Sequence, residues 1–207
     1  MRVKRYLPAQ HRLSQGLLLL SCLGFVFSVG TAAAQLPSAQ TLQLCAACHG
    51  DKGNSQMPGS PSLAGQPRVF IENQLVMIRE GLREVAQMKG LLADMKDEEF
   101  TALAKYFSQQ KIQSQTIARD TSKVTRGAVL SQRGQCGSCH LPDYSGREQM
   151  PRLAGQREDF LLSSMKEFRD GRATGRDTIM AATLRGLSDV DLTDLAHYLA
   201  TAGDGAK

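Results

Sequence analysis

Tryptophan is absent from this chain of 207 residues, and only 5% of its residues are aromatic. Segments with the alternating pattern of a β-strand are also lacking, which predicts helices throughout and excludes the βαβ context of a thioredoxin-like dithiol. A large net positive charge is lacking as well beyond residue 34, because four of the 25 basic residues and none of the 20 acidic ones lie in residues 1–34. The rest of the chain has an excess of one basic residue, which argues against the concentrated basic face of a nucleic-acid partner.

Cysteine is confined to one motif, apart from Cys22 near the N-terminus. The motif is C-x-x-C-H, and its two copies consist of Cys45, Cys48 and His49, and of Cys136, Cys139 and His140. Residues three and four apart share a helix face, so each copy can bind one porphyrin through two thioethers and a proximal histidine. A zinc site is not favoured, because the C-x-x-C pairs of such a site usually stand about 15–20 residues apart. Here the first pair ends at Cys48 and the second begins only at Cys136. We therefore predict two haem c groups, which would also supply the flat apolar core elements that the few aromatic residues do not.

Residues 1–34 have the features of a secretory signal peptide. Basic residues precede an apolar run over residues 16–30, and Ala32-Ala33-Ala34 forms an A-x-A-type cleavage site. The run is short for a membrane span, although an uncleaved N-terminal anchor is an open alternative. Export of a chain whose remaining cysteines all lie in C-x-x-C-H motifs predicts a periplasmic protein that is soluble or peripheral at the membrane.

The two halves of the chain repeat each other. The motif histidines lie 91 residues apart, Leu63 and Leu153 lie 90 apart, and Tyr106 and Tyr198 lie 92 apart. These landmarks keep register within two residues, which indicates a duplicated domain. We predict an all-α protein with a signal at 1–34, a first domain at 35–110, a linker at 111–121 and a second domain at 122–207. Apolar residues at helical spacing predict helices over residues 69–80, 97–109, 122–133, 157–169 and 189–200.

Each haem iron needs a ligand opposite its histidine, and methionine is a usual choice. The repeat register selects Met88, 39 residues after the first motif histidine, and Met180, 40 residues after the second. Met57 and Met150 are weaker alternatives, because they stand out of register with the recurring Leu-Ala-Gly-Gln segments and close to the histidines. His197 has no histidine at the corresponding place in the first half, so we expect it on the surface rather than on iron.

These motifs resemble those of the dihaem class I cytochromes of the cytochrome c4 type, over nearly all of the exported chain. The first half shares C-A-A-C-H-G-D-x-G-N-S and P-S-L-A-G-Q, and the second shares C-G-S-C-H, P-R-L-A-G-Q and Ile179-Met180. The resemblance implies two tandem class I cytochrome c domains, each wrapped round one covalently attached haem, with the haem propionates near their interface. It also implies that the backbone carbonyls of Pro61 and Pro151 accept the Nδ1–H of the motif histidines.

A haem iron with protein ligands on both sides has no place for a substrate, which predicts an electron carrier and not an enzyme. The resemblance implies a quinol-oxidising complex as electron donor and a haem–copper terminal oxidase as acceptor. An alternative is the cytochrome subunit of a periplasmic dehydrogenase such as flavocytochrome c sulfide dehydrogenase. A dihaem peroxidase would need an open position on one iron, and Met88 and Met180 argue against it.

Overall fold

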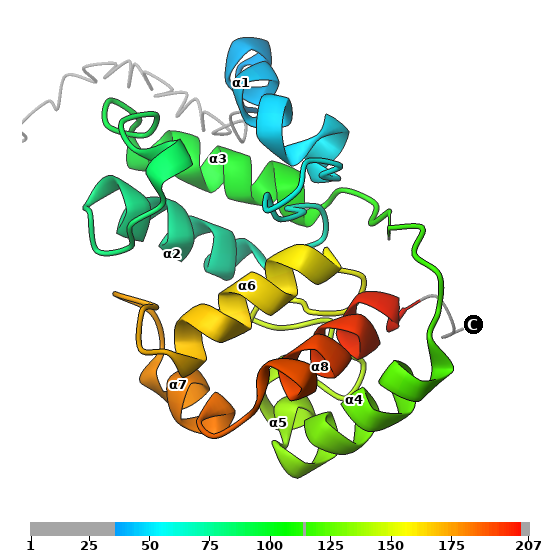
Figure 1. Ribbon diagram of the computed structural model, residues 1–207. Helices are drawn as coiled ribbons and strands as arrows, with labels where there is room; N and C mark the ends of the chain where they lie inside the picture. The colour runs from blue at the N-terminus through cyan, green and yellow to red at the C-terminus, as the bar shows by residue number, and fades with distance from the viewer. Residues whose placement is uncertain (1–35, 114, 204–207) are drawn as a thin grey trace, which may run out of the picture. The chain divides into compact units, whose positions relative to one another are not determined.

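The computed structural model describes residues 36–113 and 115–203, and Figure 1 shows the helices that they form. The signal predicted over residues 1–34 lies outside these residues. In the described ranges the chain forms helices and loops without any β-strand, apart from an isolated bridge between Arg147 and Met150, so the predicted all-α class is confirmed. None of the helices in this part of the chain is both long and apolar enough to cross a bilayer.

The first half is built on two long helices that pack together and a third that carries the first motif. Its elements are α1 (Ala39–His49), η1 (Asp51–Gly53), α2 (Arg68–Arg79), η2 (Ala86–Met88) and α3 (Asp97–Ser108), where η marks a 3-10 turn. The side chains of Ile71, Leu103 and Phe107 form the centre of the α2–α3 contact and are at most 4% exposed. Leu42 and Cys45 of α1 touch this cluster, so the core of the first half extends to the motif.

The second half is organised around its last helix. Its elements are α4 (Thr121–Arg133), α5 (Cys136–His140), α6 (Glu158–Arg169), α7 (Thr178–Leu184) and α8 (Asp189–Thr201). Helix α8 packs against both α4 and α6 (Figure 1), and its Leu192, Leu195 and Leu199 are at most 2% exposed. Arg126 of α4 donates two hydrogen bonds, at 2.5 and 2.9 Å, to the buried carboxylate of Asp194. Apolar packing and this ion pair together fix α4 on α8.

The predicted helices are present, with ends that differ by at most one residue from those expected. Ser188 caps α8 as its sequence suggests, since its hydroxyl accepts the Asp191 N–H at 3.1 Å and the Asp191 carboxylate accepts the Ser188 N–H at 2.9 Å. Helix α7 lies in a stretch for which the sequence predicts no helix. It is only seven residues long, too short for a clear apolar period, and begins where Asp177 accepts the Ile179 N–H at 2.7 Å.

The segment between α3 and α4, residues 109–113 and 115–120, contains no helix, in keeping with the predicted linker over residues 111–121. Asn54 binds this segment from the first half, donating to the Lys111 carbonyl at 3.0 Å and accepting the Gln113 N–H at 2.8 Å. Arg119 binds it to the second half by donating to the Thr201 carbonyl at 3.3 Å. The linker is therefore held on both sides, and the exact domain boundaries stay a prediction.

Candidate haem-binding sites

The first C-x-x-C-H motif occupies the last turns of α1. Cys45 is half-buried, Cys48 is exposed and His49 is buried, and the last two stand three and four residues after Cys45 on the helix. The Nδ1 atom of His49 donates to the Pro61 carbonyl at 2.8 Å. Burial lowers the pKa of the His49 imidazole and favours its neutral form. A neutral ring whose Nδ1 carries the proton presents a lone pair on Nε2, the form that binds iron.

The second motif has the same histidine geometry on a different helix. His140 donates from Nδ1 to the Pro151 carbonyl at 2.8 Å, and burial lowers its imidazole pKa. Its Nε2 atom is buried and has no hydrogen-bond partner in the described part of the chain. An unpaired buried polar atom costs free energy unless it has another ligand, so His140 fits a metal-binding role. Both histidine–proline contacts expected from the resemblance are thus present.

The two motifs reach this geometry by different backbone routes. Helix α1 runs without a break to His49, whereas α4 ends at Arg133 and α5 begins after Gln135. Gln135 has a φ of 51° and a ψ of 35°, a left-handed conformation that ends one helix and redirects the chain into the next. In each half the five residues of the motif are helical, and this short helical stretch is enough to bring the two cysteines and the histidine together. A long helix is not required.

The methionines selected by register both lie in short helical elements after the second helix of their half. Met88 is the last residue of η2, Met180 is in the first turn of α7, and both are half-buried. Met180 also contacts the core cluster of the second half. Of the two weaker alternatives, Met57 is 44% exposed, whereas Met150 is half-buried. Iron ligation by Met88 and Met180 stays a prediction.

The expectation that His197 lies on the surface is wrong, because its side chain is buried and only 3% of the residue is exposed. Its Nε2 atom accepts the Asp120 N–H at 2.9 Å, and its Nδ1 atom lies 3.1 Å from Glu158 Oε2. The reason is that α8 is covered on more than one side, by α4, by α6 and by the end of the linker, so a polar residue on this helix need not face water. Both ring nitrogens are engaged, and His197 serves as a structural contact.

Two glutamines that the sequence does not identify as functional join the halves. They are Gln66 and Gln156, the last residues of the two Leu-Ala-Gly-Gln segments. Gln66 donates to the Arg152 carbonyl at 3.0 Å and accepts the Arg152 N–H at 2.9 Å. Gln156 in turn donates to the Ser62 carbonyl at 2.9 Å and accepts the Ser62 N–H at 2.8 Å. The only sequence signal is that the segment recurs.

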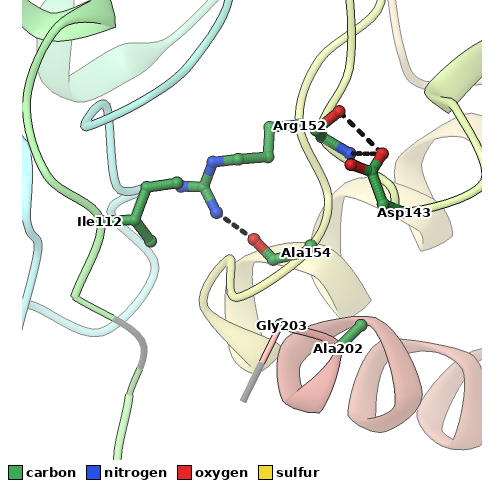
Figure 2. Close-up of a pocket in the computed structure, with 7 residues that line it drawn as sticks. Ile112, Asp143, Arg152, Ala154, Ala202 and Gly203 are labelled. Carbon is green, nitrogen blue, oxygen red and sulfur yellow. Dashed lines mark hydrogen bonds between the residues drawn. The ribbon is translucent and has the colours of Figure 1, made fainter. Parts of the chain in front are cut away.

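The side chain of Arg152 adds a further link beside these glutamines. Figure 2 shows its guanidinium between Ile112 and Ala154, where it donates to the Ala154 carbonyl. It also donates to the Ala64 carbonyl of the first half at 2.9 Å, whereas its buried Nε has no hydrogen-bond partner among the described residues. Burial lowers the pKa of Arg152 to about 10. Ser62 and Arg152, the residues next to Pro61 and Pro151, are therefore buried in the contact between the halves, and Arg152 also lines the pocket that Figure 2 shows.

Comparison with known proteins gives a consistent result for both halves. Residues 124–203 match the family described as Cytochrome c, and residues 32–107 match the family described as Cytochrome C oxidase, cbb3-type, subunit III. Cytochrome c4 of Pseudomonas aeruginosa is 34% identical over 194 residues, which cover 88% of this chain and 94% of the relative.

Two further similarities agree with this one. The thiosulfate dehydrogenase electron acceptor of Thiomonas intermedia is 30% identical, covering 88% of this chain and 89% of the relative. The crystal structure of reduced recombinant cytochrome c4 from Pseudomonas stutzeri matches the fold with a TM-score of 0.72 at 30% identity. That match covers 80% of this chain and 99% of the other.

Proposed function

Since the chain belongs to the cytochrome c4 family and is therefore a dihaem c-type electron carrier, we propose that it relays single electrons between redox proteins of the periplasm. Family membership also gives it two tandem class I cytochrome c domains and two covalently bound haem c groups. The domains extend over residues 35–110 and 122–207, with residues 111–121 between them. Cleavage after Ala34 releases the exported chain, and N-terminal sequencing of that chain tests the assignment.

The observation that carries the residue assignment is the pair of histidine–proline hydrogen bonds. His49 and His140 each donate from Nδ1 at 2.8 Å, which holds the ring and would leave Nε2 free to bind the iron. Cys45 and Cys48 hold one haem by thioether bonds, and Cys136 and Cys139 hold the other. Each bound group supplies an iron centre that takes up one electron. The protein contributes covalent retention, a fixed imidazole and burial of that imidazole from water.

We assign the opposite axial positions to Met88 and Met180. Their support is the repeat register, their half-burial and their place in short helical elements between the second and the last helix of each half. Thioether sulfur opposite imidazole favours a high reduction potential. Protein ligands on both sides of each iron would leave no open position for a substrate, which favours an electron carrier over an enzyme.

For electron donor we propose a quinol-oxidising complex, and for acceptor a haem–copper terminal oxidase. Encounters between such carriers and their partners are usually small in area and transient. A thiosulfate dehydrogenase is a second candidate donor. It is favoured because two relatives are named thiosulfate dehydrogenase electron acceptor. A permanent place in a flavocytochrome c sulfide dehydrogenase is not favoured by these relatives.

Stopped-flow mixing separates these partners. Reduced protein mixed with membranes that contain the oxidase should be oxidised at a rate that rises with oxidase concentration, and oxidised protein should be reduced by quinol only when the quinol-oxidising complex is present. Reduction by thiosulfate plus its dehydrogenase, with no response to quinol, would favour the second donor. Failure of both donors and of the oxidase to exchange electrons with the protein would contradict the carrier role.

A further inference from the structure

Each motif histidine is connected to the opposite half of the chain through a single peptide group. His49 donates to the carbonyl of the Pro61–Ser62 peptide, and the N–H of that same peptide donates to Gln156 at 2.8 Å. His140 donates to the carbonyl of the Pro151–Arg152 peptide, and the N–H of that peptide donates to Gln66 at 2.9 Å. Each peptide therefore accepts from its own histidine and donates to a glutamine of the other half.

The contact is well isolated from water. Ser62, Gln66, Arg152 and Gln156 are between 2% and 5% exposed. Each glutamine also donates to the carbonyl of the residue that it accepts from, so its amide is held by two hydrogen bonds in one orientation. Because the local dielectric is low, hydrogen bonds in such a chain polarise one another. A substitution of the glutamine should consequently alter the strength of the hydrogen bond that the histidine donates to the shared peptide.

We propose that Gln66 and Gln156 are positioning residues that set the reduction potential of the haem in the opposite half. An acceptor on the peptide N–H increases the negative charge on the peptide carbonyl, which strengthens the hydrogen bond from histidine Nδ1. That bond makes the imidazole a better electron donor to iron and so stabilises the ferric state. Reduction adds one electron to the iron, and the Nδ1 proton stays on the ring.

The two glutamines are not equivalent. The Oε1 atom of Gln156 also accepts the Arg157 N–H at 2.9 Å, whereas the Oε1 of Gln66 has the Arg152 N–H as its hydrogen-bond donor among the described residues. An oxygen atom that accepts two hydrogen bonds polarises each of its donors less than an oxygen atom that accepts one. Gln66 should therefore act more strongly on the haem of the second half than Gln156 acts on the haem of the first, which makes the two haems unequal although the halves repeat.

The test is a pair of substitutions in the full dihaem protein, read by a spectroelectrochemical titration. Gln66→Leu should raise the potential of the haem held by Cys136 and Cys139, by about a two- to fourfold change in its reduction equilibrium constant. At 59 mV per tenfold for one electron this is about 18–36 mV. Gln156→Leu should raise the potential of the haem held by Cys45 and Cys48 by a smaller amount.

Matched controls are Gln109→Leu and Gln132→Leu, one in each half, because both glutamines are exposed and lie outside the contact between the halves. They should leave both potentials unchanged. Should Gln66→Leu fail to accumulate with two haems, Gln66→Met replaces it, because methionine has nearly the same length as glutamine and its sulfur is only a weak acceptor for the Arg152 N–H. The potential of the second-half haem should then rise, and it should rise further than that of the first-half haem.

A second readout separates this effect from a purely structural one. In NMR spectra with each haem assigned through its own cysteines, Gln66→Leu should move the Nδ1–H resonance of His140 and leave that of His49 in place. The proposal would be overturned by a change in the reduction potential of the haem in the same half as the substitution, by equal changes for both haems, or by no change. The proposal rests on the assigned histidine ligands, and their failure is distinguishable, because the unsubstituted protein would then lack two histidine-ligated haems.

Discussion

Gly127 lies where α4 meets α8, and replacing it by alanine should destabilise the second half. A Cβ atom at this position would lie 2.5 Å from Tyr198 Cβ and closer still to the backbone carbonyl oxygen of Asp194. Ordinary contacts to a Cβ begin at 3.4 Å. The carbonyl oxygen is part of the α8 backbone and cannot rotate away, so the added methyl group must push the two helices apart by about one ångström.

Two opposing terms decide the sign of the effect. Alanine in a helix interior is favoured over glycine by about 1 kcal/mol, which stabilises the variant. Overpacking a tight contact costs about 1–3 kcal/mol, and a contact with backbone belongs at the upper end of that range. The expected result is a net loss of about 2 kcal/mol in the free energy of unfolding. For a chain of this size that corresponds to a fall of about 4–8 °C in the unfolding temperature.

Thermal and denaturant unfolding of the dihaem protein, followed by far-UV circular dichroism, measure this loss. Thr125→Ala is the matched control, because Thr125 is an exposed residue of the same helix and its replacement tests helix propensity without the clash. A Gly127→Ala protein as stable as the unsubstituted one, or more stable, would refute the argument that α4 and α8 are in backbone contact at Gly127.

Two further predictions concern the polar contacts of α8. His197→Leu removes the acceptor of the Asp120 N–H and should lower the free energy of unfolding by about 1–2 kcal/mol while leaving both haem potentials unchanged, as urea unfolding and redox titration can check; a shifted potential would reopen His197 as a ligand. Hydrogen bonds from Lys166 and Arg169 hold the pKa of Asp189 below its ordinary value of 3.8, so its stabilising contribution is present above that pH and is lost as the pH falls through the lower native pKa. Asp189→Asn should therefore lose less stability than the unsubstituted protein as the pH is lowered from about 5 to 2, and equal losses would contradict the assignment.

The features that the sequence predicts correctly are local ones. The helices follow from apolar spacing, and the start of α8 follows from Ser188 and Asp191, whose hydrogen bonds span three residues. The motif histidines are found because C-x-x-C-H encodes its chemistry in adjacent residues. Their bonds to Pro61 and Pro151 were expected from the family resemblance, and the structure confirms those bonds.

The features that the sequence does not reveal depend on distant packing. Gln66 and Gln156 bind backbone atoms that lie 86 and 94 residues away, and a bond to backbone leaves no complementary side chain to recognise. His197 is misjudged because its neighbours on α4, α6 and the linker cannot be read from the α8 sequence. The break at Gln135 is also hidden, since left-handed backbone at a non-glycine residue carries no clear composition signal.

We propose that His49 with Met88, and His140 with Met180, bind the two haem irons. Magnetic circular dichroism of the ferric protein, combined with a haem count by pyridine haemochrome, distinguishes this ligand set from others. We expect two haems per chain, both low-spin with histidine and methionine ligation, and the loss of one such haem each in Met88→Ala and Met180→Ala. Retention of both methionine-ligated signals in either variant, or a high-spin haem in the unsubstituted protein, would contradict it.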